Sequence, residues 1–165
     1  AYATWAGRQL PTEAQFELVA RSKRNSTFPW EGEELAPDGH HHANTWQGNF
    51  PIENTGEDEH VGIAPVGCFK PNDFGVYDLI GNVWEWTTDW YAPGHNPSDN
   101  SNPDGPAEDQ SFDYANAGFP VKVIKGGSYL CAPNYCMRYR PAARQAADTG
   151  LGTSNIGFRT EKSIR

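Results

Sequence analysis

The chain has 165 residues and a net charge of −8, from 13 basic and 21 acidic side chains. That length is enough for one domain with its own core. The acidic balance argues against a nucleic-acid-binding surface, and no apolar run approaches the ~18 residues that a membrane span needs. We therefore expect one soluble domain without nucleic-acid or membrane partners.

Aromatic residues are abundant although apolar residues make up only 37% of the chain, with 6 Trp, 7 Tyr and 8 Phe. The 17 Gly and 13 Pro indicate many turns and leave little room for long helices. Large rings can fill a compact core under these conditions. The composition predicts an α+β, loop-rich single domain with little regular secondary structure.

Two helices are expected near the N-terminus. Residues 1–7 carry aromatic residues three apart and end in glycine, as the last turn of a helix does. Thr12 and Gln15 can form a capping box for a helix from about 12 to 22. Phe16 lies on the face of that helix that should pack inward.

Residues 25–65 have little periodicity and many turn formers, which predicts an ordered loop. Three successive histidines, His40 to His42, cannot converge on one ion from an extended backbone, so we expect them at the surface. Asn44, Thr45, Asp58 and His60 offer amide, carboxylate and carbonyl oxygens, which are ligands of hard cations such as Ca²⁺. Such residues are also ordinary turn formers, and the sequence pattern leaves both possibilities open.

The next two segments have strand-like patterns. Cys68 lies in the run IAPVGCF and has no partner in sequence, so we expect a small buried side chain. Residues 74–90 read FGVYDLIGNVWEWTTDW. Val83 alternates there with polar neighbours, which predicts a strand in which Trp84 or Trp86 fills the core. Glu85 lies between two of these tryptophans and needs a partner if it is buried, and a cation could supply one.

Residues 121–124 alternate as a strand and lead into Gly126 and Gly127. Paired glycines allow another backbone segment to approach closely. The last patterned run, SNIGFRT, predicts a closing strand in which Ile156 and Phe158 are packed.

The stretch KGGSYLCAPNYCMRYRPAAR holds Cys131 and Cys136. Pro133 and Asn134 form a turn dipeptide, which predicts a hairpin with the two cysteines facing each other. Opposed Cβ atoms lie roughly 4.5 to 5.5 Å apart, close enough for a disulfide or for two thiolates on one soft metal ion. A pair of buried inert thiols is the third alternative, and the adjacent Gly126–Gly127 pair argues against it.

Basic residues surround this pair in the sequence. A cationic environment lowers the pKa of a thiol and favours the thiolate. Two sulfur ligands with no third ligand nearby suit low-coordinate Cu(I) better than tetrahedral zinc. The residues expected to form this cationic surround are Lys125, Arg138, Arg140 and Arg144, with Tyr139 on the opposite face from Arg138 and Arg140.

Five segments together resemble the formylglycine-generating enzymes, also called sulfatase-modifying factors. They are LPTEAQFELVAR, NTWQGNFPIENTGED, GVYDLIGNVWEWTTDW, GGSYLCAPNYCMRYR and SNIGFR. The match extends from the first residues to about Arg159. The resemblance implies the fold of that family, which is related to the C-type lectin fold, with residues 1–165 as the C-terminal portion of the domain and an N-terminal part missing.

The resemblance also implies an activity. It is that of a copper-dependent oxidase that uses O₂ and a reductant to convert a cysteine in a Cys-x-Pro-x-Arg segment of an unfolded or extended sulfatase polypeptide into Cα-formylglycine. Cys131 and Cys136 match the family cysteines that hold Cu(I). The other residues implied at the catalytic cleft are Ser128, Asn155, Trp84 and Tyr135.

Two structural Ca²⁺ sites are implied in the same way. Asparagine and aspartate side chains act with main-chain carbonyls in the first, and two carboxylates act with main-chain carbonyls in the second. The first site matches Asn44, Thr45, Asp58 and His60, and the second matches Asp78, Gly81, Val83 and Glu85.

Vertebrate members of the family carry two further disulfides, whose positions correspond here to Ala3, Ala20, Pro141 and Thr160. Their absence fits a cytoplasmic protein of prokaryotic type, which does not need an oxidising compartment to fold. We also expect a monomer. Two other functions remain open on the same scaffold: a non-catalytic binding module and an iron(II) oxygenase.

Overall fold

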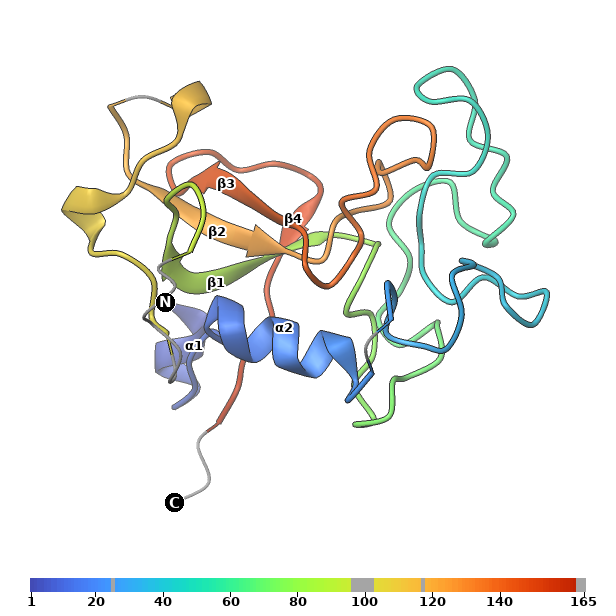
Figure 1. Ribbon diagram of the computed structural model, residues 1–165, viewed down its shortest axis with the longest axis horizontal. Helices are drawn as coiled ribbons and strands as arrows, with labels where there is room; N and C mark the ends of the chain where they lie inside the picture. The colour runs from blue at the N-terminus through green and yellow to red at the C-terminus, as the bar shows by residue number, and fades with distance from the viewer. Residues whose placement is uncertain (25, 96–102, 117, 163–165) are drawn as a thin grey trace.

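The computed structural model describes residues 1–24, 26–95, 103–116 and 118–162. A small curled sheet lies in the left half of the view in Figure 1, with two helices below it and long loops to its right. The helices are α1 (Tyr2–Trp5) and α2 (Glu13–Arg21), and the strands are β1 (Trp84–Trp90), β2 (Val121–Lys125), β3 (Arg144–Asp148) and β4 (Ile156–Gly157). Two short 3₁₀ turns, Glu108–Gln110 and Tyr114–Asn116, precede β2.

The predicted capping box is present at the start of α2. The Gln15 backbone N–H donates to Thr12 Oγ1 at 3.1 Å, and Gln15 Oε1 accepts from the Thr12 backbone at 2.7 Å. Phe16 is buried against Ala20 and Leu79. The helix prediction is therefore confirmed. It could be made from the sequence because both the start of the helix and its buried face depend on neighbouring residues.

The sheet has the order β3-β2-β1-β4. Strands β1 and β3 are antiparallel to β2, and β4 is parallel to β1. Val121 and Val123 are fully buried, as the alternation in β2 predicts. The closing strand is shorter than predicted: β4 ends at Gly157, so Ile156 is half-buried while Phe158 is 51% exposed, and the prediction that Phe158 is packed is wrong.

A buried ion network joins α2 to the sheet. Lys125 has no exposed surface, and its Nζ lies 2.9 Å from Glu17 Oε2 and 3.5 Å from Glu13 Oε1. The Arg144 guanidinium donates to both oxygens of Glu13 at 2.8 Å. The acidic first turns of α2 therefore bind two of the four basic residues that we expected around the cysteines.

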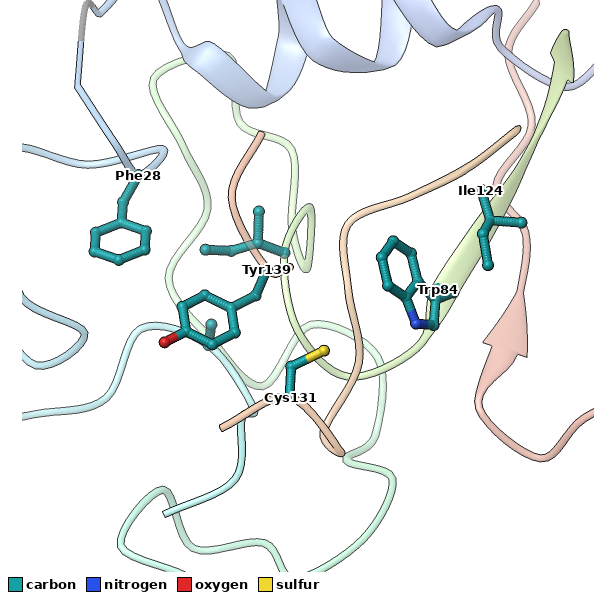
Figure 2. Packing of buried hydrophobic residues seen from close by; sticks show 7 residues of the cluster. Phe28, Trp84, Ile124, Cys131 and Tyr139 are labelled. Atoms are coloured by element: carbon teal, nitrogen blue, oxygen red, sulfur yellow. The ribbon is translucent and has the colours of Figure 1, made fainter. Parts of the chain in front are cut away.

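Loops pack against the other end of the sheet through a second core cluster (Figure 2). Its buried members are Phe28, Ala43, Ile80, Trp84, Ile124, Cys131 and Tyr139. Tyr139 is 1% exposed while its neighbours Arg138 and Arg140 are exposed, as predicted. This cluster brings the cysteine segment against the sheet.

Cys68 corrects another prediction. The run 63–69 does not form a strand, because a turn at Val66 and Gly67, with Gly67 at φ 80°, redirects the chain. Cys68 is exposed rather than buried. None of the helices that the structure describes is long and apolar enough to span a membrane.

Candidate functional site

Residues 128–138, which we call the cysteine loop, leave and return to the sheet at one point. Gly127 has φ 74°, and a Cβ on it would lie 2.7 Å from the Cα of Tyr139. Only glycine fits such an approach. The sequence predicts that the paired glycines let another backbone segment approach closely, and this is confirmed at Gly127. The approaching backbone is that of Tyr139, at the end of the same loop.

The two cysteines are brought together by a tight turn. The backbone N–H groups of Cys136 and Tyr135 both donate to the carbonyl of Ala132, at 2.8 and 3.1 Å. This is a single helical turn without a strand ladder, so the predicted hairpin is wrong, although the turn position is right. The two thiols are free, and Cys136 packs against the buried cluster that contains Cys131. The Cys136 thiol also contributes to the raised pKa of Cys131, so the turn brings the two side chains near each other, as the sequence predicts.

Cys131 is 3% exposed and Cys136 is half-buried. Burial raises the pKa of the Cys131 thiol to about 11, hydrogen bonds from Ser128 oppose the rise, and the Cys136 thiol adds to it. The predicted lowering of the thiol pKa is therefore wrong for Cys131. Lys125 and Arg144 pair with the acidic residues of α2, while Arg138 donates to Gln145 and Arg140 to the Met137 carbonyl.

Ser128 and Asn155 lie together beside Cys131. The Asn155 side-chain amide donates to Ser128 Oγ at 3.2 Å, and the Leu130 backbone donates to the same oxygen at 3.3 Å. Because Ser128 Oγ accepts twice, its own hydrogen remains to be donated, and a side-chain hydrogen bond from Ser128 lowers the pKa of Cys131. The Asn155 carbonyl accepts from Trp84 N–H at 2.8 Å, which ties β4 to β1 at this point.

The two aromatic residues expected at the cleft lie in different environments. Trp84 is 4% exposed, and Figure 2 shows the Cys131 sulfur pointing toward its ring. Tyr135 is 70% exposed and stacks on Phe50 with ring centroids 4.6 Å apart. Phe50 in turn contacts Trp46, with centroids 5.1 Å apart. Nothing local in the sequence indicates that Phe50 reaches the cysteine loop.

The first candidate calcium site contains an unsatisfied buried oxygen. Asn44 is fully buried, and its Nδ2 donates to Gly62 O at 2.8 Å and to Asn82 Oδ1 at 3.0 Å. Its Oδ1 has no hydrogen-bond partner. A buried amide oxygen without a donor is costly, and a cation would satisfy it.

Other oxygens of this site converge nearby. The carbonyl and hydroxyl of Thr45 and Oδ2 of Asp58 all accept from Gln47 Nε2, at 2.5, 3.2 and 2.9 Å. Asp58 Oδ1 accepts from the His60 backbone at 3.0 Å. Several oxygens thus converge on the Gln47 side-chain nitrogen, and Asn44 Oδ1 has no donor. This arrangement fits a hard cation. Gln47 and Asn82 are members of this site that our sequence analysis missed.

The second candidate calcium site fits only in part. Asp78 Oδ1 is buried without a partner, and Oδ2 accepts from Gly67 N–H at 2.6 Å. Both Glu85 oxygens, however, accept from Arg159, at 2.5 and 2.6 Å. Burial raises the pKa of Glu85, and Arg159 opposes that rise. The partner that a buried Glu85 requires is therefore an arginine 74 residues away, which no local pattern indicates.

The two candidate calcium sites adjoin. Gly81 has φ 72°, and a Cβ on it would lie 2.3 Å from the Asn44 carbonyl oxygen. Val83, the remaining predicted member of the second site, is half-buried just before β1. His41 Nε2 lies 3.8 Å from Glu57 and His42 Nε2 lies 3.0 Å from Asp38, so the two neighbouring histidines face different carboxylates. Among the residues described, no three Cys, His, Asp or Glu side chains form a metal-binding group, so Cys131 and Cys136 offer a two-sulfur site.

Comparison with known proteins gives consistent relatives. Residues 1–164 match the family described as sulfatase-modifying factor enzyme 1-like domain. Formylglycine-generating enzymes from Mus musculus and Mycobacterium tuberculosis are each 48% identical over 96% of this chain, which covers 40% and 52% of those proteins. The chain thus spans about half the length of these relatives or less. A mouse protein named inactive C-alpha-formylglycine-generating enzyme 2 is 33% identical over 99% of the chain and 46% of its own length.

Solved structures share the fold. PvdO from Pseudomonas aeruginosa superposes with a TM-score of 0.69 at 28% identity, covering 96% of this chain and 56% of that one. Treponema denticola variable protein 1 gives a TM-score of 0.67 at 26% identity, covering 93% and 46%. Together with the family match over nearly every residue, these results show that the chain belongs to the sulfatase-modifying factor family.

Proposed function

We propose that this chain carries the reactive thiol pair of an enzyme that converts a protein cysteine into Cα-formylglycine. The observation that carries the proposal is the placement of two free thiols on one turn, with Cys131 buried and Cys136 half-buried against the same cluster. Relatives that bear the name formylglycine-generating enzyme support the reaction. The substrate is an extended sulfatase polypeptide containing a Cys-x-Pro-x-Arg segment.

Cys131 and Cys136 would hold Cu(I), because soft thiolates select that ion and two ligands suit it. When bound, the metal supplies the chemistry with dioxygen that protein side chains lack. The overall reaction balances as one substrate thiol, O₂, two electrons and two protons giving one aldehyde, H₂S and water. A thiol reductant would supply the two electrons.

The chain's own residues prepare the site for that reaction. Trp84 and Tyr139 exclude water from the inner side of Cys131, since both are almost fully buried in the same cluster. Ser128 directs its hydroxyl hydrogen toward the Cys131 sulfur, and Asn155 holds Ser128 in that orientation. Cys136 and the exposed Tyr135 form the side from which a peptide would approach.

Calcium would have a structural role in this proposal. The Asn44–Asp58 site has an orphan amide oxygen and converging oxygens, so it fits a hard cation better than the Asp78–Glu85 site. At the second site calcium would share Glu85 with Arg159. Either ion would stiffen loops that pack against the cysteine loop.

The proposal is tested by incubating the protein with Cu(I), O₂, a thiol reductant and a Cys-x-Pro-x-Arg peptide, and measuring aldehyde by mass spectrometry. Cys131→Ser and Cys136→Ser should each abolish conversion and Cu(I) binding. Cys68→Ser is the matched control, because this third thiol is exposed and should be dispensable. Wild-type conversion by either site variant would refute the proposal.

A non-catalytic binding module is the second candidate, since a mouse relative at 33% identity is named inactive. Such a module would bind a Cys-x-Pro-x-Arg peptide without producing aldehyde in the presence of Cu(I) and O₂. An iron(II) oxygenase would be recognised by conversion that depends on iron and survives loss of both cysteines.

A further inference from the structure

Asn82 lies where three loops meet, just before β1. It is 6% exposed and has a left-handed backbone, with φ 59°. Its Oδ1 accepts from Asn44 Nδ2 at 3.0 Å and from Ala64 N–H at 2.9 Å, and its Nδ2 donates to the Ala64 carbonyl at 3.2 Å. The Asn82 side chain is therefore hydrogen-bonded both to Asn44 of the first candidate calcium site and to Ala64 in the loop that follows that site.

The Asn82 side chain determines which end of the Asn44 amide is free. Since Asn44 Nδ2 is engaged by Asn82 Oδ1 and the Gly62 carbonyl, the amide nitrogen faces away from the candidate calcium site. The orphan Oδ1 is the end left for a cation. Without the Asn82 acceptor, the Asn44 amide loses one of its two anchors.

The Asn82 backbone connects the same site to the cysteine loop. Asn82 N–H donates to the Asn44 carbonyl at 2.8 Å, and the Asn82 carbonyl accepts from Tyr129 N–H at 2.9 Å. Two residues further on, the Cys131 carbonyl accepts from Trp46 N–H at 3.0 Å. Residues 44–46 therefore hold residues 129–131 at both ends, directly at Cys131 and through Asn82 at Tyr129.

We propose that Asn82 is a positioning residue that couples cation binding at Asn44 and Asp58 to the geometry of the Cys131–Cys136 pair. The inference rests on the proposed calcium site and does not require the proposed catalysis. A cation on Asn44 Oδ1 fixes residues 44–46, and these fix both ends of the segment that carries Cys131. Calcium should therefore make the buried Cys131 thiol less accessible to a labelling reagent.

The test uses the Cys68→Ser protein without copper, with labelling of Cys131 and Cys136 followed by peptide mass spectrometry. Terbium luminescence reports occupancy of the cation site. Calcium should slow labelling of Cys131 by about fivefold or more, the lower range of measured couplings between sites. Asn82→Gly keeps the left-handed backbone and removes only the side chain, so the calcium effect on labelling should fall below about twofold.

Two further variants separate coupling from general destabilisation. Asn82→Asp keeps an acceptor for Asn44 and Ala64 and should keep the calcium effect. Asn72→Ala removes a comparable amide, which donates to the Val19 carbonyl and accepts from Phe74 and Val76 rather than from Asn44 or the cysteine loop, and should also keep it. The proposal is overturned if Asn82→Gly keeps the full calcium effect, if bound terbium or calcium leaves labelling unchanged, or if neither ion binds. Aldehyde formation is measured separately, so failure of this coupling and failure of the catalytic proposal are distinguishable.

Discussion

Gly127 and the backbone of Tyr139 are in direct contact, and this contact closes the loop that carries both cysteines. A Cβ at residue 127 would lie 2.7 Å from Tyr139 Cα and 2.8 Å from Tyr139 N. Neither atom belongs to a flexible side chain. The distance between the two ends of the cysteine loop is therefore set by the absence of a side chain at one position.

Gly127→Ala should lower the free energy of unfolding by about 3 kcal/mol, because it adds a backbone clash to left-handed strain. Gly75→Ala is the matched control, since Gly75 has φ 73° and open space around its Cβ position. Gly75→Ala adds only the strain of a left-handed backbone and should lower the free energy of unfolding by about 1 to 2 kcal/mol. Urea unfolding measures both, and equal losses would contradict the close contact.

Lys125→Met should reduce stability by about 2 kcal/mol, because it removes a donor from the buried Glu13 carboxylate and from the half-buried Glu17 carboxylate. Glu13 and Glu17 keep Arg144 and Arg21 as partners, which limits the loss. Since Lys125 binds α2 rather than the thiols, the pH midpoint of cysteine labelling should not change. A shifted pH midpoint of labelling would instead indicate that Lys125 acts electrostatically on the thiols, as the sequence predicts.

The thiol of Cys131 should label slowly near neutral pH in the metal-free protein. Burial raises its pKa from the usual 9.0 to about 11, and the thiolate is the reactive form. Its labelling rate should therefore keep rising to about pH 11. The folded state also holds this proton more tightly than the unfolded chain, so its contribution to stability is full below about pH 9 and is lost as the pH rises toward 11. A labelling midpoint at or below pH 9 would contradict this environment.

Arg159→Gln should cost about 3 to 5 kcal/mol in the presence of a chelator, the usual result of leaving one member of a buried ion pair alone. Calcium should recover part of the loss, because it can neutralise Glu85 from the side of Asp78. Thermal unfolding with chelator and with calcium measures the difference. Arg24→Gln serves as control, since the Arg24–Asp73 pair is exposed and its removal should change little.

Asp58→Asn should remove most of the stabilisation that calcium gives to the chain. Calcium at about 100 times its Kd adds about 2.7 kcal/mol to a protein that binds it only when folded. Chelation should lower the Tm of the unaltered chain and leave that of Asp58→Asn nearly unchanged. Asp73→Asn, at an exposed carboxylate, is the control and should show the full decrease in Tm on chelation. If Asp58→Asn shows the same decrease, calcium binds at another site.

Features encoded by neighbouring residues could be predicted from the sequence. The Thr12–Gln15 capping box spans three positions, and the burial of Val121 and Val123 follows from alternation alone. The turn between Cys131 and Cys136 was also predicted from the Pro133–Asn134 dipeptide, although its geometry is helical.

Contacts between distant segments could not be predicted in this way. Arg159 reaches Glu85 across 74 positions, and Lys125 reaches Glu17 across 108. A basic residue near a cysteine in sequence gives no information on which carboxylate it meets in the fold. This is why the predicted activation of the thiols by arginine and lysine failed, while the proximity of the thiols themselves did not.

The short parallel pairing of β4 with β1 links two separate parts of the site. Only Trp84 and Glu85 pair with Ile156 and Gly157, and the residues flanking β4 supply the Asn155 bond to Ser128 and the Arg159 bonds to Glu85. Local detachment of this one short strand would therefore release the Ser128 hydroxyl and leave the buried Glu85 carboxylate unpaired in a single step.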